Sequence, residues 1–285
     1  MADHGADVSV AAPAFPKDAG PIVAIDSGHQ NFHTLEGRFA PFARLLSNDG
    51  FRVRPATGAF TTSSLADVSL LVIANALHPS NVDNWTLPTP SAFTSEEIAA
   101  LRTFVENGGS LLLIADHMPF GGAAADLAAA FGVTFLNGFA FYTPSPEAPD
   151  FLTREQGLGQ DVILLGRASA GSITQVATFT GTAFRAPPVA RKLLVLSDEY
   201  VILTPKTAWQ FLPDTPRIGA KGLLQGAALS HGKGRLAVFG EAAMFTAQVQ
   251  DTDPKQRTGF GAPGAEQNKQ FVLNLAHWLA GLLGP

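Results

Sequence analysis

Histidine and carboxylate side chains are concentrated in a few short polar segments of this 285-residue chain. In the first of them His29 and His33 are spaced i, i+4, with Asp26 just before them and Asn31 between them. If the segment turns helically, both imidazoles lie on one face, which is the spacing that metal-binding helices use. The pattern therefore points to metal ligation.

Asp116 and His117 form a second polar segment. Adding either to His29 and His33 gives three or four nitrogen and oxygen ligands, a set that suits zinc or another divalent transition metal. An open coordination position would lower the pKa of bound water and generate a nucleophile. We expect a divalent metal, with zinc as the first choice, held by His29, His33, Asp116 and Asp26. The structural alternative is that these side chains hydrogen-bond loop backbones and cap the following helix.

Proton transfer is the second chemistry that these residue types support. Two titratable groups at a strand end, beside a helix N-terminus, can have their pKa values pushed apart, which makes Asp116 and His117 a candidate acid and base pair. Glu241 is a candidate general base, and Asn31 or a backbone amide near Gly121 is a candidate oxyanion donor. The alternatives are that Asp116 caps a turn, His117 packs under apolar side chains and Glu241 stabilises a helix N-terminus.

Two weaker patterns complete the candidate site. Ser27 could be a nucleophile with His29 or His117 as its base, although the Gly-x-Ser-x-Gly elbow of serine hydrolases is missing. Several aromatic residues in loop-like segments could form an apolar wall for a substrate, with core packing as the alternative; these are Trp85, Phe139, Phe141, Tyr142 and Trp209.

Each polar segment follows an apolar run that is typical of a buried strand. The runs are Pro21 to Ile25, Leu70 to Ala74, Leu111 to Ala115 and Leu236 to Phe239. Continuous apolar runs of about five residues are typical of strands buried on both faces, and such strands normally form parallel sheets covered by helices. Residues just past the ends of parallel strands gather on one edge, where open α/β folds place their ligands.

Helix and turn signals agree with this α/β organisation. Thr94-Ser-Glu-Glu97 matches a capping box and predicts a helix that ends at Gly108. Residues 230–234 have the composition of a β-hairpin turn, and residues 271–282 carry a helical apolar face. Residues 1–20 lack periodicity and predict a flexible N-terminal arm.

The domain prediction is one α/β unit over residues 21–285 with an insertion at about 138–190. Within this insertion the sequence is rich in Pro, Gly, Ser and Thr. Short strands are predicted at 161–165 and 173–179, and the whole segment is expected to lie over the sheet edge as a lid.

Three segments resemble the class I glutamine-amidotransferase-like superfamily, near its trehalose-utilisation-protein-like and gliding-motility-accessory-like groups. They are residues 25–34, 115–122 and 232–245. The resemblance implies a flavodoxin-like sheet with helices on both faces. In true amidotransferases the turn after a central strand carries a Cys nucleophile, whereas this chain has Asp116 and His117 there and no Cys at all. Glutamine hydrolysis by that mechanism is therefore excluded.

Composition narrows the function classes further. The net charge of −5 and the absence of a basic run argue against nucleic acid as a partner. No apolar stretch approaches the roughly 20 residues of a membrane span. The first residues do not form a secretory signal, so we expect either a cytoplasmic protein or an exported one whose signal has been removed. The oligomeric state is left open.

The preferred hypothesis is a hydrolase, with metal assistance, acting on a small or oligomeric polar substrate such as a carbohydrate derivative, ester or amide. A catalytically silent domain that binds a carbohydrate or another ligand in the same cleft is the alternative. A metal-free serine esterase based on Ser27 is the third hypothesis.

Overall fold

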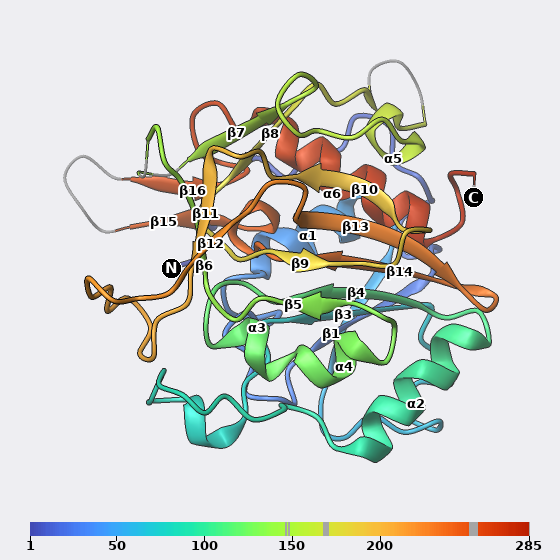
Figure 1. Ribbon diagram of the computed structural model, residues 1–285. Coiled ribbons are helices and arrows are strands. Elements are labelled where there is room, and N and C mark those ends of the chain that lie inside the picture. The colour runs from blue at the N-terminus through green and yellow to red at the C-terminus, as the bar shows by residue number, and fades with distance from the viewer. Residues whose placement is uncertain (146, 148, 168–170, 251–255, 285) are drawn as a thin grey trace.

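The apolar runs form the centre of a twisted sheet in the computed structural model, which describes residues 1–145, 147, 149–167, 171–250 and 256–284 (Figure 1). The strand order is β2-β1-β3-β4-β14-β13-β9-β5, with β10 also paired to β13. β2, β1, β3, β4 and β14 run parallel, as the buried runs of the last four predict, whereas β2 is a largely exposed edge strand. Their bounds are Arg52–Ala56, Ile22–Asp26, Leu70–Ala74, Ser110–Ile114 and Gly234–Phe239.

The remaining strands of this sheet are antiparallel. β13 and β14 form the predicted hairpin around the 230–234 turn, and β10, β9 and β5 extend the sheet beyond β13. The bounds are Leu224–His231 for β13, Arg191–Val195 for β10, Phe184–Arg185 for β9 and Thr134–Phe135 for β5. The predicted α/β class, with a mostly parallel central sheet and a late hairpin, is confirmed.

Helices cover both faces of the sheet, and each face has its own apolar core (Figure 1). On one face lie α1 (Ala40–Asn48) and α6 (Glu266–Leu279), which packs Phe271 and Trp278 into the core. On the other lie α2 (Ser95–Glu106), α3 (Phe120–Ala123) and α4 (Ala125–Ala129). A flavodoxin-like arrangement of layers results.

The predicted capping box at the start of α2 is confirmed. Thr94 Oγ1 accepts a hydrogen bond from the Glu97 amide, and Glu97 Oε2 accepts one from the Thr94 amide. These bonds satisfy two amides that the first helical turn would otherwise leave unpaired. The box fixes the position of the Glu97 carboxylate, and this position becomes important for the polar edge of the sheet.

Segments between the main strands build three smaller sheets. β6 (Phe139–Tyr142) pairs with β11 (Tyr200–Leu203), which also pairs with β12 (Arg217–Gly219). β7 (Asp150–Thr153) pairs with β8 (Gln175–Thr178), and β15 (Ala247–Val249) pairs with β16 (Arg257–Gly259). Two short 3-10 helices, η1 (Pro79–Asn81) and η3 (Ala243–Phe245), lie in loops.

Residues 138–190, which were expected to form a lid, contribute strands to the main sheet and to the small sheets. In this segment β9 belongs to the main sheet, whereas β6, β7 and β8 belong to the small sheets. The strand predicted at 161–165 is wrong, because residues Val162–Leu165 form the short helix α5. Asp161 accepts a hydrogen bond from the Ile163 amide, so a local helix cap prevails over the strand preference of the Val-Ile pair. The strand predicted at 173–179 corresponds to β8, and residues 168–170 lie outside the described residues.

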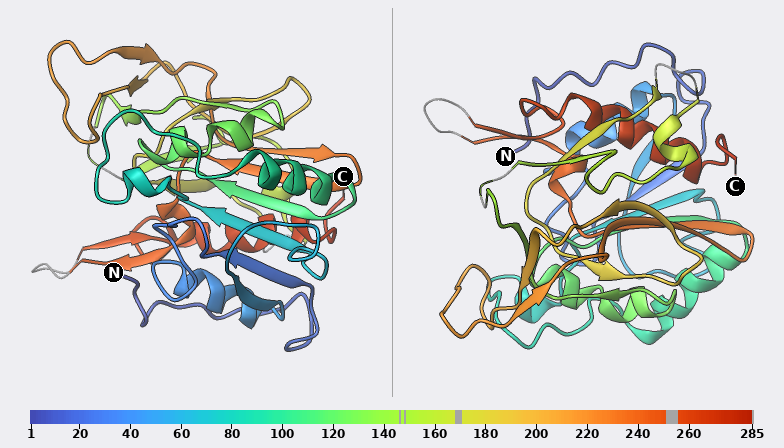
Figure 2. Two further views of the ribbon diagram at one scale, coloured as in Figure 1. Left: turned by 90° about the horizontal axis from the view of Figure 1, so that it is seen from below. Right: turned by 45° about the horizontal axis from the view of Figure 1, so that its top comes forward.

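The first 20 residues lie against the domain rather than apart from it (Figure 2). Arg44 and Asn48 of α1 donate hydrogen bonds to the backbone carbonyls of His4 and Val8. Phe15 packs edge-on against Phe51, with ring centroids 5.1 Å apart. Among the described residues, no helix is long and apolar enough to cross a membrane.

Candidate functional site

The loop after β1 is organised around His29. Its Nδ1 lies 2.9 Å from Asp26 Oδ1, and its Nε2 lies 2.9 Å from Glu97 Oε1, the carboxylate of the capping box. The imidazole stacks on Phe60 and is tilted against Phe93, at centroid distances of 4.5 and 4.9 Å. Both ring nitrogens are therefore occupied, and the ring packs against two phenyl groups. His29 connects the carboxyl end of β1 to the amino end of α2.

This arrangement favours a charged imidazole. Burial disfavours the charge, but the hydrogen bonds and charges of Asp26 and Glu97 outweigh burial and raise the pKa of His29 above its ordinary value. The Nδ1 and Nε2 atoms then both donate to carboxylates. His29 and its two acids form a buried, closed ion pair network, which is a structural arrangement.

Asn31 belongs to the same network. Its Nδ2 donates to Asp26 Oδ2 at 2.9 Å, and its Oδ1 accepts the His29 amide at 3.0 Å. Asn31 thus orients Asp26 and the loop. The Gly122 amide, beside the predicted oxyanion donor Gly121, donates to Asn137 Oδ1 at 3.0 Å. The Asn31 side chain and the Gly122 amide are thus engaged within the protein.

His33 lies in a separate buried chain that runs toward β4. Asn75, the residue after β3, contacts His33 Nδ1 through its Nδ2 at 3.0 Å and accepts the Asp116 amide through its Oδ1 at 2.9 Å. Burial, together with the nearby Arg38 and His117, lowers the pKa of His33 to about 3, so this imidazole is neutral. In the described part of the chain His33 Nε2 is buried and makes no hydrogen bond.

The residues proposed as metal ligands do not fit a shared ion. His29 and His33 use ring nitrogens in different networks, and His29 has no nitrogen free. Asp26 is bonded to His29 and Asn31, whereas Asp116 caps the turn after β4 by accepting the His117 amide. Among the described residues no group of three or more His, Cys, Asp or Glu side chains could hold a metal ion. The i, i+4 spacing fails to bring the imidazoles together because residues 27–39 form bends and turns, not a helix.

Asp116, His117 and Glu241 lie together at the ends of β4 and β14, as predicted. Glu241 is fully buried and accepts the amides of Ala243 and Met244 at 2.8 and 2.7 Å. Burial first, and then the charge of Asp116, raise the pKa of Glu241 well above its ordinary value. The negative charge of Asp116 therefore acts on the Glu241 carboxyl at this edge of the sheet.

His117 differs from the other two site histidines because its ring reaches solvent. Its Nδ1 lies 2.7 Å from the Met118 carbonyl, and Nε2 has no hydrogen-bond partner among the described residues. The ring stacks on Phe139 with a centroid distance of 4.6 Å and an interplanar angle of 11°, and Trp209 meets it edge-on at 4.8 Å. His117 is therefore held rigidly with one nitrogen available.

Aromatic rings continue on both sides of His117 and form what we call the aromatic rim. Each ring contacts at least one other ring of the group at a centroid distance of 4.6 to 5.9 Å. The rim consists of Phe32, Trp85, Phe120, Phe139, Trp209 and Phe211. Trp209 is 51% exposed, and Phe32 and Phe211 are also exposed. Arg38 lies over the Phe32 ring, 3.9 Å from its centroid.

Sequence reasoning identified part of this rim. Trp85, Phe139 and Trp209 were expected as an apolar wall, and all three contact His117. Tyr142 lies elsewhere, against Tyr200. Phe32 and Phe211 were missed, although each lies in a loop beside other polar or aromatic residues, which is the signal that could have found them.

Hydrogen bonding does not pair Ser27 with a base. Its Oγ is buried and has no partner in the described part of the chain, and both nitrogens of His29 are engaged with carboxylates. A nucleophilic serine requires a base within hydrogen-bond reach. The geometry therefore gives no support to Ser27 as a nucleophile.

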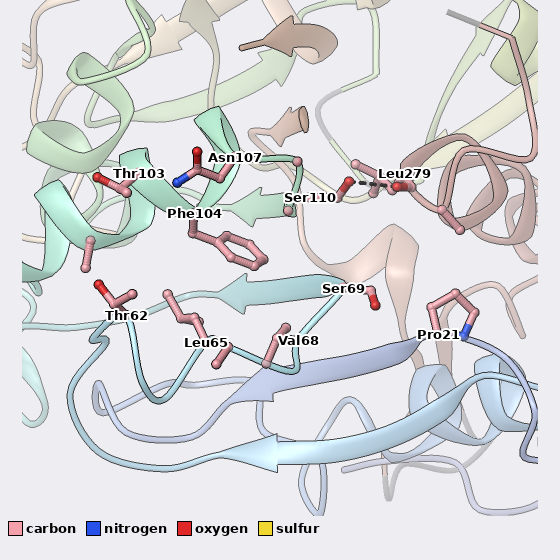
Figure 3. Close-up of a pocket in the computed structure, with 15 residues that line it drawn as sticks. Pro21, Thr62, Leu65, Val68, Ser69, Thr103, Phe104, Asn107, Ser110 and Leu279 are labelled. Carbon is pink, nitrogen blue, oxygen red and sulfur yellow. Dashed lines mark hydrogen bonds between the residues drawn. The ribbon is translucent and has the colours of Figure 1, made fainter. Parts of the chain in front are cut away.

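A cavity of about 500 Å³ lies at the opposite edge of the sheet, at the amino ends of the strands (Figure 3). Pro21, Ser69 and Ser110 line it where β1, β3 and β4 begin, and Ser110 donates a hydrogen bond to the Leu279 carbonyl. Its wall holds no His, Asp or Glu. The titratable side chains of this protein gather at the other edge, which is the edge that open α/β folds use.

Comparison with known proteins supports the fold. No protein-family model matches the sequence, and a search of curated proteins finds no match either. The mmIFT52 N-terminal domain has a TM-score of 0.63 and 16% identity over 90% of this chain and 97% of that chain. A putative ThuA-like protein from Bacteroides uniformis has a TM-score of 0.51 and 13% identity, covering 97% of this chain and 95% of its own.

A cytoplasmic protein from Salmonella typhimurium gives a similar result, with a TM-score of 0.52 and 12% identity over 91% of this chain and 98% of that chain. At such low sequence identities, structural similarity is evidence for a shared fold alone and carries no information about activity. The chain therefore shares an α/β fold with these proteins.

Proposed function

We propose that the aromatic rim and the β4 turn form a carbohydrate-binding site. The observation that carries this proposal is the exposure of Trp209 beside a rigid, solvent-reaching His117. Sugar rings present a face of C–H groups that packs on aromatic rings, and their hydroxyls need nearby polar partners. The aromatic rim supplies rings on which a sugar face can pack, and His117 supplies one polar partner for the hydroxyls.

Charge and polarity at the rim suit a neutral, hydroxyl-rich ligand. Asp116 and His117 offer an acceptor and an imidazole, and Arg38 adds a guanidinium beside Phe32. These groups come from the loops after β1 and β4. An apolar surface with a few convergent polar groups is the usual form of a small-ligand site.

Tryptophan fluorescence tests this proposal directly. The chain has three Trp residues, of which Trp85 and Trp209 lie in the rim and Trp278 is fully buried in the core. Titration with methyl glucosides, methyl galactosides and maltooligosaccharides should give a saturable change in emission for at least one member of the panel. Trp209→Ala should weaken that binding by about tenfold or more, since loss of a stacking contact of about 1.4 kcal/mol corresponds to a factor of ten.

Phe151→Ala provides a matched control, because Phe151 is also an exposed aromatic residue but lies on β7, outside the rim. It should bind the same sugar as tightly as the unmodified protein. Equal losses in the Trp209 and Phe151 variants would contradict the proposal. So would a folded protein that shows no saturable response to any sugar in the panel.

A hydrolase is the second candidate, favoured by the buried pair of Asp116 and Glu241. The raised pKa of Glu241 beside a second carboxyl is a combination found in acid and base catalysis. His117 Nε2 could move a proton at the rim. Against this, Glu241 is fully buried and its oxygens accept backbone amides.

Turnover separates the two candidates. A panel of nitrophenyl glycosides and esters should be bound without release of nitrophenol if the site only binds. Release that is abolished by Asp116→Asn and retained by Asp126→Asn, which removes an acid from α4 outside the site, would establish the hydrolase instead.

A further inference from the structure

A second cavity, of about 320 Å³, lies between the small sheets and contains no basic side chain. β6, β7 and β11 contribute its main walls (Figure 1). Its lining includes Asp150, Glu199, Tyr142 and Tyr200, together with the neutral polar residues Ser197 and Gln156. None of these residues contacts the His117 ring or the aromatic rim. The chemistry of this cavity is acidic and aromatic.

The environment of Asp150 is the observation that indicates a ligand site. Asp150 is only 7% exposed, and its carboxyl makes no hydrogen bond or ion pair with any described residue. Burial without a partner raises its pKa to about 7, from an ordinary value of 3.8. A buried carboxylate normally has hydrogen bonds or a cation that offset its desolvation. Asp150 lacks both among the residues that the structure describes, so a cationic partner from solution would offset its burial.

The two tyrosines form an aromatic wall beside this carboxylate. Tyr142 and Tyr200 are direct neighbours across β6 and β11, with ring centroids 5.1 Å apart. Asp150 lines the same cavity as both tyrosines. Burial first, and with it the nearby carboxylates, raises the pKa of both phenols. Tyr200 is 6% exposed, and its hydroxyl has no hydrogen-bond partner among the described residues.

A second carboxylate completes the acidic lining. Glu199 Oε2 accepts a hydrogen bond from the Tyr142 hydroxyl at 3.2 Å, and the Glu199 amide donates to Ser197 Oγ at 3.2 Å. Lys221 forms an ion pair with Asp198 at 3.1 Å and does not line the cavity. The cavity thus has two carboxylates and no protein cation to balance them.

We propose that this cavity binds a small organic ammonium ion. The carboxylates of Asp150 and Glu199 supply the charge complement, and the faces of Tyr142 and Tyr200 supply the cation–π surface that alkylammonium groups prefer. The aromatic component favours an organic cation over a metal ion, which would require more oxygen ligands. This site is separate from the proposed carbohydrate site, and each can fail without the other.

Calorimetric titration with choline and ethanolamine tests the proposal. The control ligand is 3,3-dimethylbutan-1-ol, which has the shape of choline without its charge. At least one of the two ammonium probes should bind saturably, about tenfold or more tighter than the neutral alcohol, because only the cations gain from the carboxylates and the phenol rings.

Two variants locate the binding. Asp150→Asn keeps the shape of the side chain and removes its charge, so the protein should remain folded and lose about tenfold or more in affinity for the ammonium probe. Glu155→Gln removes one negative charge from the exposed turn after β7, outside the cavity, and should bind as the unmodified protein does.

Three results would overturn the proposal. The first is equal binding of choline and its neutral analogue. The second is unchanged affinity in the Asp150→Asn variant, and the third is no saturable binding of either ammonium probe to folded protein. Sugar binding at the aromatic rim is unaffected by any of these outcomes, so failure here is distinguishable from failure of the proposed function.

Discussion

The loop after β1 and the turn after β4 carry the same residue types at the same edge of the sheet, yet they are built for different purposes. In the β1 loop, His29 has both ring nitrogens hydrogen-bonded to carboxylates and its ring packed against Phe60 and Phe93. In the β4 turn, His117 has one nitrogen anchored and the other open at the surface. A closed network stabilises the fold, whereas an open one is available to a ligand.

The contrast shows what separates structural from functional histidines at such an edge. His29 and His117 each lie three residues past the end of a parallel strand, so strand position does not distinguish them. The number of partners that the surrounding elements supply does distinguish them: Glu97 of α2 completes His29, and no acid reaches His117 Nε2 among the described residues. The variants below test this difference between the His29 network and the β4 turn.

Removing the His29 imidazole should have the largest effect. His29→Ala leaves the carboxylates of Asp26 and Glu97 buried without their cation, and breaking a buried ion pair in this way costs about 3–5 kcal/mol. Urea denaturation followed by circular dichroism measures the loss. His78→Ala, at a half-buried loop position, is the control and should change stability much less. Equal losses of stability in the two variants would show that His29 does not stabilise the fold by linking the β1 loop to α2.

Glu241→Gln should have the next largest effect. Glu241 accepts backbone amides through both of its oxygens, and the amide group of Gln would place a donor opposite one of them. A buried donor without an acceptor costs about 1–3 kcal/mol. The free energy of unfolding should fall by that amount. An unchanged free energy of unfolding would mean that the amides of Ala243 and Met244 find other acceptors.

A third prediction concerns pH. The pKa of His29 is raised in the folded protein, so its contribution to stability is fully present below the unfolded pKa of about 6.5 and is lost as pH rises through the folded pKa. The pKa of Asp150 is raised to about 7, so folding also becomes less favourable as pH rises from 3.8 toward 7.

Both effects act in the same direction, and they can be separated by mutation. The melting temperature should fall as pH rises from about 6.5 to 8, because below pH 6.5 the lowered pKa of His33 makes stability rise with pH and opposes the effect of Asp150. His29→Gln should remove most of this decline, and Asp150→Asn should remove the part of it that lies below about pH 7. A melting temperature that increases steadily over this range would contradict both assignments.

Trp209→Ala should have the smallest effect on stability. Its side chain is half exposed, and surface substitutions usually change the free energy of unfolding by less than about 0.5 kcal/mol. Thermal denaturation checks this expectation. A loss of several kcal/mol would show that the aromatic rim is part of the core rather than a ligand surface.

Much of the fold could be predicted because its signals are local. The buried strands, the Thr94 capping box and the late hairpin each depend on residues close together in sequence, and all three are confirmed. Chain direction then placed Asp116 and Glu241 at one edge, since parallel strands end together.

The details of the site could not be predicted, because they depend on partners from distant elements. Glu97 is recognisable as a cap, but its second hydrogen bond, to His29, arises only when α2 packs beside the β1 loop. The same holds for Asn75, which joins His33 to Asp116. The i, i+4 histidine spacing suggested one shared face, and the turns of residues 27–39 place the two rings in different networks.

Backbone amide chemical-shift mapping with the tightest-binding sugar of the panel tests the central contrast most directly. The account predicts shifts in the β4 turn at residues 116–120 and in the loop at residues 209–211, with no shifts around His29 and Glu97. Shifts centred on His29 and Glu97, with the β4 turn unchanged, would contradict it.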